Sequence, residues 1–240
     1  MSAGERSKLP DKAAGSGEVA DFLRKLAATP AVRPTAGKRG RLMFALDATA
    51  SRQPTWDRAC HIQAEMFKET AALGGLDIQL VFYRGFGEFR STGWLGDSGE
   101  LSRRMIGVSC LGGRTQIAKL LRHALAETRR ERINALVFVG DSMEEEVDAL
   151  SHLAGELGLL GVPVFVFHEG RDAIAARAFQ QIARLSNGAY CRFDANSAQQ
   201  LRELLSAVAV FAAGGRLALE NYSRRTGGAV LQITRQLGKP

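Results

Sequence analysis

The stretch LMFALDATAS, residues 42–51, decides the fold of this chain. Residues 42–46 are all apolar, which favours a strand that is buried on both faces, as strands of parallel sheets are. The apolar run ends at Asp47, and Thr49 and Ser51 follow on alternate residues. Because alternate side chains of an extended segment point the same way, we expect three oxygen-bearing side chains to gather where this strand ends.

Outward from this stretch, short apolar runs alternate with longer segments of helical spacing. Helices are expected over 54–73, 117–128, 143–159, 172–185 and 198–213, with a weak one within 96–106. Strands are expected over 76–85, 86–94, 133–141, 162–168 and 189–194. The alternation predicts a three-layer α/β/α, Rossmann-like, doubly wound sheet, mostly parallel, with one short antiparallel edge strand over 86–94.

The two ends of the chain differ from its body. Residues 1–17 lack a hydrophobic period and are predicted to be disordered. Residues 18–40 read as a short amphipathic helix, which either packs on the domain or binds a partner, followed by a basic linker. The folded domain is expected over 41–213, and 214–240 form a basic C-terminal extension.

The net charge of +7 belongs to those ends, because residues 42–213 contain 18 Lys and Arg against 20 Asp and Glu. A nucleic-acid partner is therefore not expected, since it would have to bind the tails alone. No run approaches the roughly 20 apolar residues of a membrane span, and the first residues lack the apolar core of a signal peptide. Three widely spaced cysteines do not form a disulfide framework. We expect a cytoplasmic protein without membrane attachment.

Acidic residues end two of the expected strands. Asp47 ends the first, and Asp141 ends the strand over 133–141. Ligands of open parallel sheets bind at the carboxyl ends of strands, and Thr115 stands just before a helix after two glycines. Carboxylate and hydroxyl oxygens suit a hard cation such as Mg²⁺, Mn²⁺ or Ca²⁺. Such a site would bind its ion weakly, because hydroxyls add no charge, and the ion would still attract an anion from outside.

The motifs DATAS, GGRT and VGD, in this order and at these element boundaries, resemble the von Willebrand factor A (VWA) domain with its metal-ion-dependent adhesion site (MIDAS), of the cytosolic bacterial type. The resemblance covers residues 41–211. It implies that Asp47, Thr49, Ser51, Thr115 and Asp141 hold the ion directly or through water. Thr49 departs from the family, which usually has serine there.

The same resemblance implies a function without catalysis. An Asp or Glu of a partner protein would displace a water from the ion and complete its coordination. Cytosolic members of the family are often associated with ATPase or chaperone assemblies, so the resemblance implies a partner of that kind.

An enzymatic interpretation uses some of the same residues. FALDATAS and FVGDSMEEEVD also resemble the haloacid-dehalogenase phosphohydrolases, with Asp47 as the nucleophile and Asp141 with Glu145 or Glu146 holding Mg²⁺. Against it, Thr49 stands where that family has its general acid, and a hydroxyl does not deliver a proton near neutral pH as a carboxyl does. The segment between the motifs also lacks the expected strand ending in Ser or Thr and followed by Lys.

A purely structural interpretation is also open. Asp47 would then form a turn, Ser51 and Thr115 would cap the helices that follow them, and Asp141 with Ser142 would begin the next helix.

Overall fold

The computed structural model describes residues 14–29, 39–193 and 198–226. Its centre is a six-stranded sheet in the order β3-β2-β1-β4-β5-β6. The strands are β1 Gly40–Asp47, β2 Leu76–Arg84, β3 Glu88–Ser91, β4 Ala135–Gly140, β5 Val164–Glu169 and β6 Ala189–Phe193. All neighbouring strands are parallel except β2 and β3. The predicted fold class is confirmed, including the short antiparallel strand at one edge.

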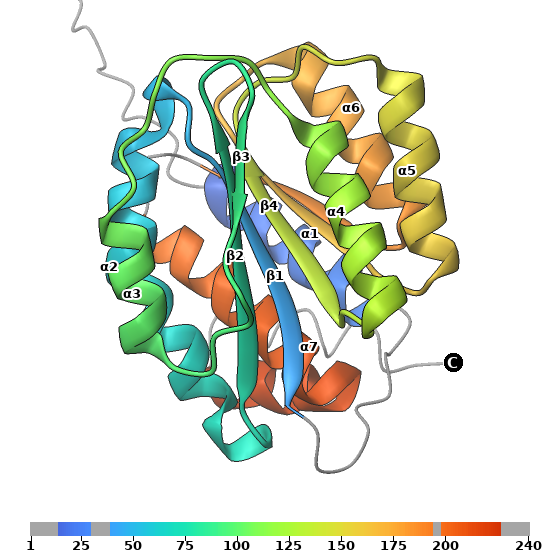
Figure 1. The fold of residues 1–240 in the computed structure, drawn as a ribbon. Coiled ribbons are helices and arrows are strands. Elements are labelled where there is room, and N and C mark those ends of the chain that lie inside the picture. Colours follow the sequence, from blue (N-terminus) through green and yellow to red (C-terminus); the bar gives the residue numbers. More distant parts are fainter. Residues whose placement is uncertain (1–13, 30–38, 194–197, 227–240) are drawn as a thin grey trace, which may run out of the picture.

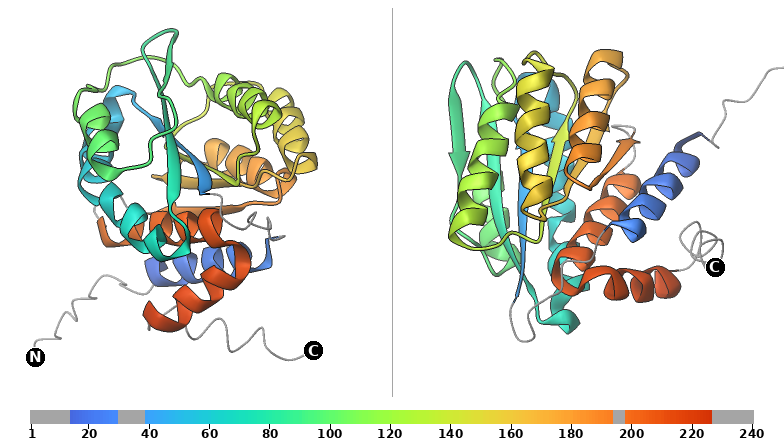
Figure 2. Two further views of the ribbon diagram at one scale, coloured as in Figure 1. Left: turned by 60° about the horizontal axis from the view of Figure 1, so that its bottom comes forward. Right: turned by 90° about the vertical axis from the view of Figure 1, so that its right-hand side faces the viewer.

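Helices cover both faces of the sheet (Figures 1 and 2). One face carries α4 Ile117–Arg130, α5 Val147–Leu159 and α6 Ala173–Leu185, and the other carries α1 Ala14–Ala28, α2 Gln53–Thr70, α3 Ser98–Ile106 and α7 Ala198–Thr226. Short 3-10 turns, Ala50–Arg52 and Ala71–Leu73, flank α2. Strand β1 serves both layers, because Leu42, Phe44 and Leu46 join one buried cluster and Met43 and Ala45 the other. The alternation along an extended chain explains why residues 42–46 are apolar throughout.

The N-terminal helix α1 packs on the domain. Phe22 and Leu26 are fully buried, and the ring of Phe22 meets the ring of Phe167 edge-on at 5.3 Å between centroids. The predicted helix is therefore present, and of its two interpretations the packed one is observed. It begins at Ala14 and not at residue 18, because a helix anchored by packing extends at little cost into neighbouring residues. The remainder of the predicted tail, residues 1–13, and most of the basic linker, 30–38, lie outside the described residues.

The last helix is longer than predicted. Helix α7 continues past residue 213 to Thr226, with Gly215 interrupting the helical backbone at φ 69° and ψ −164°. Leu219 and Ser223 beyond this kink are buried, so the first part of the predicted C-terminal extension packs on the body. Residues 227–240 lie outside the described residues. Within the part of the chain that the structure describes, no helix is long and apolar enough to cross a bilayer.

Candidate metal centre

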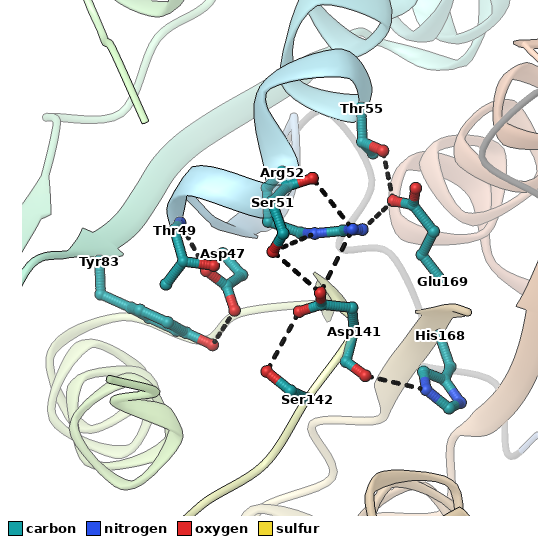
Figure 3. A network of polar contacts seen from close by, with 10 residues as sticks. All are labelled: Asp47, Thr49, Ser51, Arg52, Thr55, Tyr83, Asp141, Ser142, His168 and Glu169. Carbon is teal, nitrogen blue, oxygen red and sulfur yellow. Dashed lines mark hydrogen bonds and ion pairs between the residues drawn. The ribbon is translucent and has the colours of Figure 1, made fainter. Parts of the chain in front are cut away.

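The strands β1 and β4 are parallel neighbours at the place where the strand order of the sheet reverses, and the predicted acids lie at their carboxyl ends. Leu46 of β1 pairs with Val139 of β4, so the segments that follow them leave the sheet side by side. The Ser51 hydroxyl donates a hydrogen bond to Oδ2 of Asp141, with 3.0 Å between the oxygens (Figure 3). The fold therefore joins DATAS to VGD at the switch point of the sheet, where ligands of such folds bind.

Asp47 is a buried carboxylate surrounded by neutral hydrogen-bond donors. Only 2% of it is exposed. Its Oδ1 accepts from the Thr49 backbone N–H at 2.7 Å, and its Oδ2 accepts from the Tyr83 hydroxyl at 3.2 Å. Burial, together with the nearby charge of Asp141, raises the pKa of Asp47 to about 6, and the hydrogen bonds from the Thr49 amide and hydroxyl oppose that rise. Burial also raises the pKa of Tyr83, which therefore stays protonated and donates.

Asp47 lacks a compensating cation. Among the described residues, no Lys, Arg or His forms an ion pair with it. Asp47 and Asp141 repel each other and lie next to hydroxyls, so they make an oxygen-only donor set in which the charge of Asp47 is not balanced by any described cation. The described residues hold no group of three or more His, Cys, Asp or Glu suited to a metal. A cation at this rim would therefore take much of its protein coordination from hydroxyl oxygens.

Thr115 is positioned by the glycines before it. Its backbone neighbour Arg114 donates to the Gly85 carbonyl at 3.1 Å, and a Cβ added at Gly113 would lie 2.0 Å from that carbonyl oxygen. The GGRT loop therefore lies directly against the turn between β2 and β3. The Thr115 hydroxyl accepts from the Glu144 backbone N–H at 3.2 Å. Thr115 thus lies beside the segment that follows Asp141, although within the described residues it bonds neither carboxylate directly.

A second set of residues at this rim was missed by the sequence reasoning. One guanidinium nitrogen of Arg52 lies 3.3 Å from Oδ2 of Asp141, and another binds Glu169, which also accepts from the Thr55 hydroxyl. Glu169 ends β5 in the same way that Asp47 ends β1, so the rule of strand-terminal residues could have found it. Arg52 directly follows DATAS, but nothing in the sequence indicates where its side chain points.

His168 also contributes beneath the rim. Its Nε2 lies 3.2 Å from the Asp141 carbonyl and its Nδ1 lies 2.8 Å from the Tyr190 hydroxyl. Burial lowers the pKa of His168, so it acts as a neutral support for the Asp141 backbone.

The structural interpretation of these residues fails at three positions. Ser51 bonds Asp141 and does not cap α2, which has no side-chain cap. The cap of α4 comes from Glu145, whose carboxylate accepts from the first backbone N–H groups of that helix, and not from Thr115. Helix α5 begins at Val147, later than predicted, because the segment before it is held by these contacts to α4. The bond from the Thr49 amide to Asp47 does have the form of a simple turn, as the structural interpretation expects.

Comparison with known proteins gives structural matches alone. No protein-family model matches the sequence, and no curated protein does. Among solved structures, the SpRpn10 VWA domain superposes with a TM-score of 0.55 at 16% identity, covering 70% of this chain and 94% of that one. The chain has a VWA-like fold.

Two other solved structures also resemble this chain in fold. An aerotolerance-related membrane protein from Bacteroides fragilis, with multiple mutations to serines, matches at 19% identity and a TM-score of 0.51, covering 68% of this chain and 96% of that one. Proximal thread matrix protein 1 from the mussel byssus, with a zinc-occupied MIDAS motif, matches at 16% identity and a TM-score of 0.55, covering 75% of this chain and 46% of that one. At these identities the likeness shows the VWA-like fold and leaves the chemistry to the residues themselves.

Proposed function

We propose that this chain is a cytoplasmic, VWA-type protein-interaction module that binds a divalent cation at a MIDAS-like site. The ligands, direct or through water, are Asp47, Thr49, Ser51, Thr115 and Asp141. The observation that carries the proposal is the buried Asp47 carboxylate, which no cation of the described residues pairs with, next to the Ser51–Asp141 contact that joins two distant motifs. The ion is Mg²⁺, or Mn²⁺ or Ca²⁺, because all the donors are oxygens.

A bound ion would supply positive charge for an acidic side chain of a partner. The two carboxylates balance a divalent charge only if both are ionised, and the hydroxyls add dipoles without charge. Weak binding and residual attraction for an anion follow from this ligand set. We therefore expect the partner to be a protein that presents Asp or Glu, and the resemblance favours an ATPase or chaperone assembly.

The surface beside the site also favours a protein partner. Phe86, at the turn between β2 and β3, is 86% exposed and Leu111 is 47% exposed. Both lie near the metal ligands, because the Leu111 backbone N–H donates to the Ala48 carbonyl at 3.0 Å and the Leu111 carbonyl accepts from Gly85. Exposed aromatic and aliphatic side chains are typical anchors of protein interfaces. A partner with apolar residues flanking its acid would fit this rim.

Calorimetric titration with Mg²⁺ and Mn²⁺ tests the metal. The wild-type chain should bind both ions, and Asp47→Ala should bind neither. The matched control is Glu146→Gln, which removes an exposed carboxylate outside the proposed ligand set. Its affinity should equal that of the wild type. Equal binding by Asp47→Ala would contradict the proposed site.

The partner surface is tested by capture experiments with and without Mg²⁺. Phe86→Ala should lose the Mg²⁺-dependent partner, as Asp47→Ala should. The control is Leu159→Ala at the end of α5, because Leu159 is 90% exposed at the opposite end of the sheet. If Leu159→Ala and Phe86→Ala reduced capture of the partner equally, docking at the rim would be contradicted.

The phosphohydrolase alternative has less support from the geometry. Both Glu145 oxygens accept backbone N–H groups of α4, so this carboxylate is committed to capping that helix. Thr49 offers only a hydroxyl where a general acid is needed. We expect no turnover of generic aryl phosphates. Turnover that is lost in Asp47→Asn would overturn the proposal in favour of the enzyme.

A further inference from the structure

The Arg52 guanidinium lies between two carboxylates that end neighbouring strands. It is 3.3 Å from Oδ2 of Asp141 after β4, and it pairs with Glu169 at the end of β5 (Figure 3). The Arg52 and Glu169 side chains are 9% and 6% exposed. Water therefore screens these charges poorly, and their interactions with a nearby ion are stronger than those of surface groups.

Arg52 uses the same Asp141 oxygen that accepts the Ser51 hydroxyl. Its Nε also lies 3.4 Å from the Ser51 hydroxyl oxygen, and a terminal nitrogen donates to the Ser51 carbonyl at 3.1 Å. Two of the proposed metal ligands, Ser51 and Asp141, are thus already in contact with a fixed positive charge. Asp47, the other proposed carboxylate ligand, is not in contact with this positive charge.

We propose that Arg52 is an internal counter-cation that competes with a divalent ion for Asp141, and that Glu169 limits the strength of this competition by offsetting the charge of the guanidinium. The inference rests on the metal site of the proposed function. It makes Arg52 and Glu169 affinity-determining residues that are not themselves ligands.

The two residues have opposite effects on a bound ion. The guanidinium repels a divalent cation at Asp141 and partly neutralises the negative charge on Oδ2 of that residue. Glu169 offsets this repulsion, and the Thr55 hydroxyl, bonded to the same Glu169 oxygen, fixes its position. A merely structural ion pair would behave differently, because loss of either partner would disturb the site in the same direction.

The test is the Kd for Mn²⁺, measured by calorimetry at pH 7.5 in the intact 240-residue chain. Arg52→Gln should bind Mn²⁺ at least about tenfold more tightly, because repulsion disappears and Glu169 is left uncompensated. Glu169→Gln should bind about tenfold more weakly, because the guanidinium charge is then unopposed. The double variant should return towards the wild-type Kd. Each single variant tests the proposal on its own, and circular dichroism establishes which of them is folded.

Arg114→Gln is the control for net charge. It makes the same charge change beside Thr115, but on an exposed side chain without an ion pair in the described residues. Solvent screening should limit its effect to less than about threefold. A gain equal to that of Arg52→Gln would overturn the specific role of Arg52.

The outcomes separate this inference from the proposed function. If neither the wild type nor Arg52→Gln binds Mn²⁺, the proposed metal site is wrong and the role of Arg52 falls with it. If the wild type binds and Arg52→Gln binds equally well, or both single variants shift the Kd in one direction, the metal site stands and only the counter-cation is refuted.

Discussion

Asp47 at the end of β1 and Glu169 at the end of β5 are both strand-terminal carboxylates, and only 2% and 5% of these residues is exposed. Their settings are opposite. Glu169 has a guanidinium and a hydroxyl on one oxygen, whereas among the described residues the groups that donate to Asp47 are neutral, and it faces the charge of Asp141. The carboxyl ends of the strands therefore carry one carboxylate, Glu169, whose charge is balanced within the described fold, and another, Asp47, whose charge is not.

This difference distinguishes a carboxylate paired within the fold from one that could accept an external cation. A buried carboxylate with its own cation is costly to separate from that cation and offers little to an incoming ion. A buried carboxylate without one has a raised pKa and gains most from a cation that arrives from outside. At the proposed site, a divalent ion would therefore bind at the end of β1 in preference to the end of β5. The predictions below change one side of this contrast at a time.

The largest effect should follow from making Glu169 resemble Asp47. Arg52→Ala leaves Glu169 buried without its cation, and breaking one side of such a pair costs about 3 kcal/mol. Urea denaturation in EDTA at pH 7.5 measures the loss in free energy of unfolding. The double variant Arg52→Met, Glu169→Leu should recover most of it, because apolar residues then replace both charges. A loss below about 1 kcal/mol in Arg52→Ala would show that water already screens this pair.

A gain in stability should follow from removing the uncompensated charge. The pKa of Asp47 rises from 3.8 to about 6 on folding, so its ionisation opposes folding as pH rises through this window, and the full penalty remains above it. Asp47→Asn should therefore raise the free energy of unfolding by about 2 kcal/mol at pH 7.5 without metal. The gain should shrink as pH falls from 6 towards 4.

The control for this gain is Asp148→Asn, an exposed acid in the first turn of α5. It should change stability by less than about 0.5 kcal/mol. An equal gain in both variants would mean that overall charge, and not the setting of Asp47, is responsible.

The contrast also shows what the sequence could predict. Alternating apolar runs predicted the sheet and most helices, because the fold depends on burial and the pattern of buried positions in each element is visible in its own stretch of sequence. Asp47 and Asp141 were found as strand-terminal acids in the same way. Arg52 was not, because its role depends on where a long side chain points after the chain has folded. Tyr83 was missed for a similar reason. In the sequence it cannot be told from the other core residues of its strand, and only the fold shows that its buried hydroxyl reaches Asp47.

Lowering the pH should weaken metal binding through Asp47. Only its ionised form binds a cation, so the affinity for Mn²⁺ should fall about tenfold between pH 7 and pH 5. The groups that face it are Asp141, which favours protonation, and the Thr49 and Tyr83 donors, which oppose it. Calorimetry across this range measures the change. A constant Kd would mean that Asp47 is not the titrating ligand.

The smallest effect should come from removing one neutral donor from Asp47. Tyr83→Phe keeps the ring but deletes a hydrogen bond of 3.2 Å, which should cost about 1 kcal/mol or less. That bond favours the ionised carboxylate, so its loss should raise the pKa of Asp47 further and move the midpoint of the pH-dependent Mn²⁺ affinity upward. Tyr190→Phe is the matched control, because its hydroxyl binds His168 and not Asp47. A midpoint unchanged in Tyr83→Phe would mean that the Tyr83 hydroxyl holds the geometry of the Asp47 carboxylate without tuning its charge.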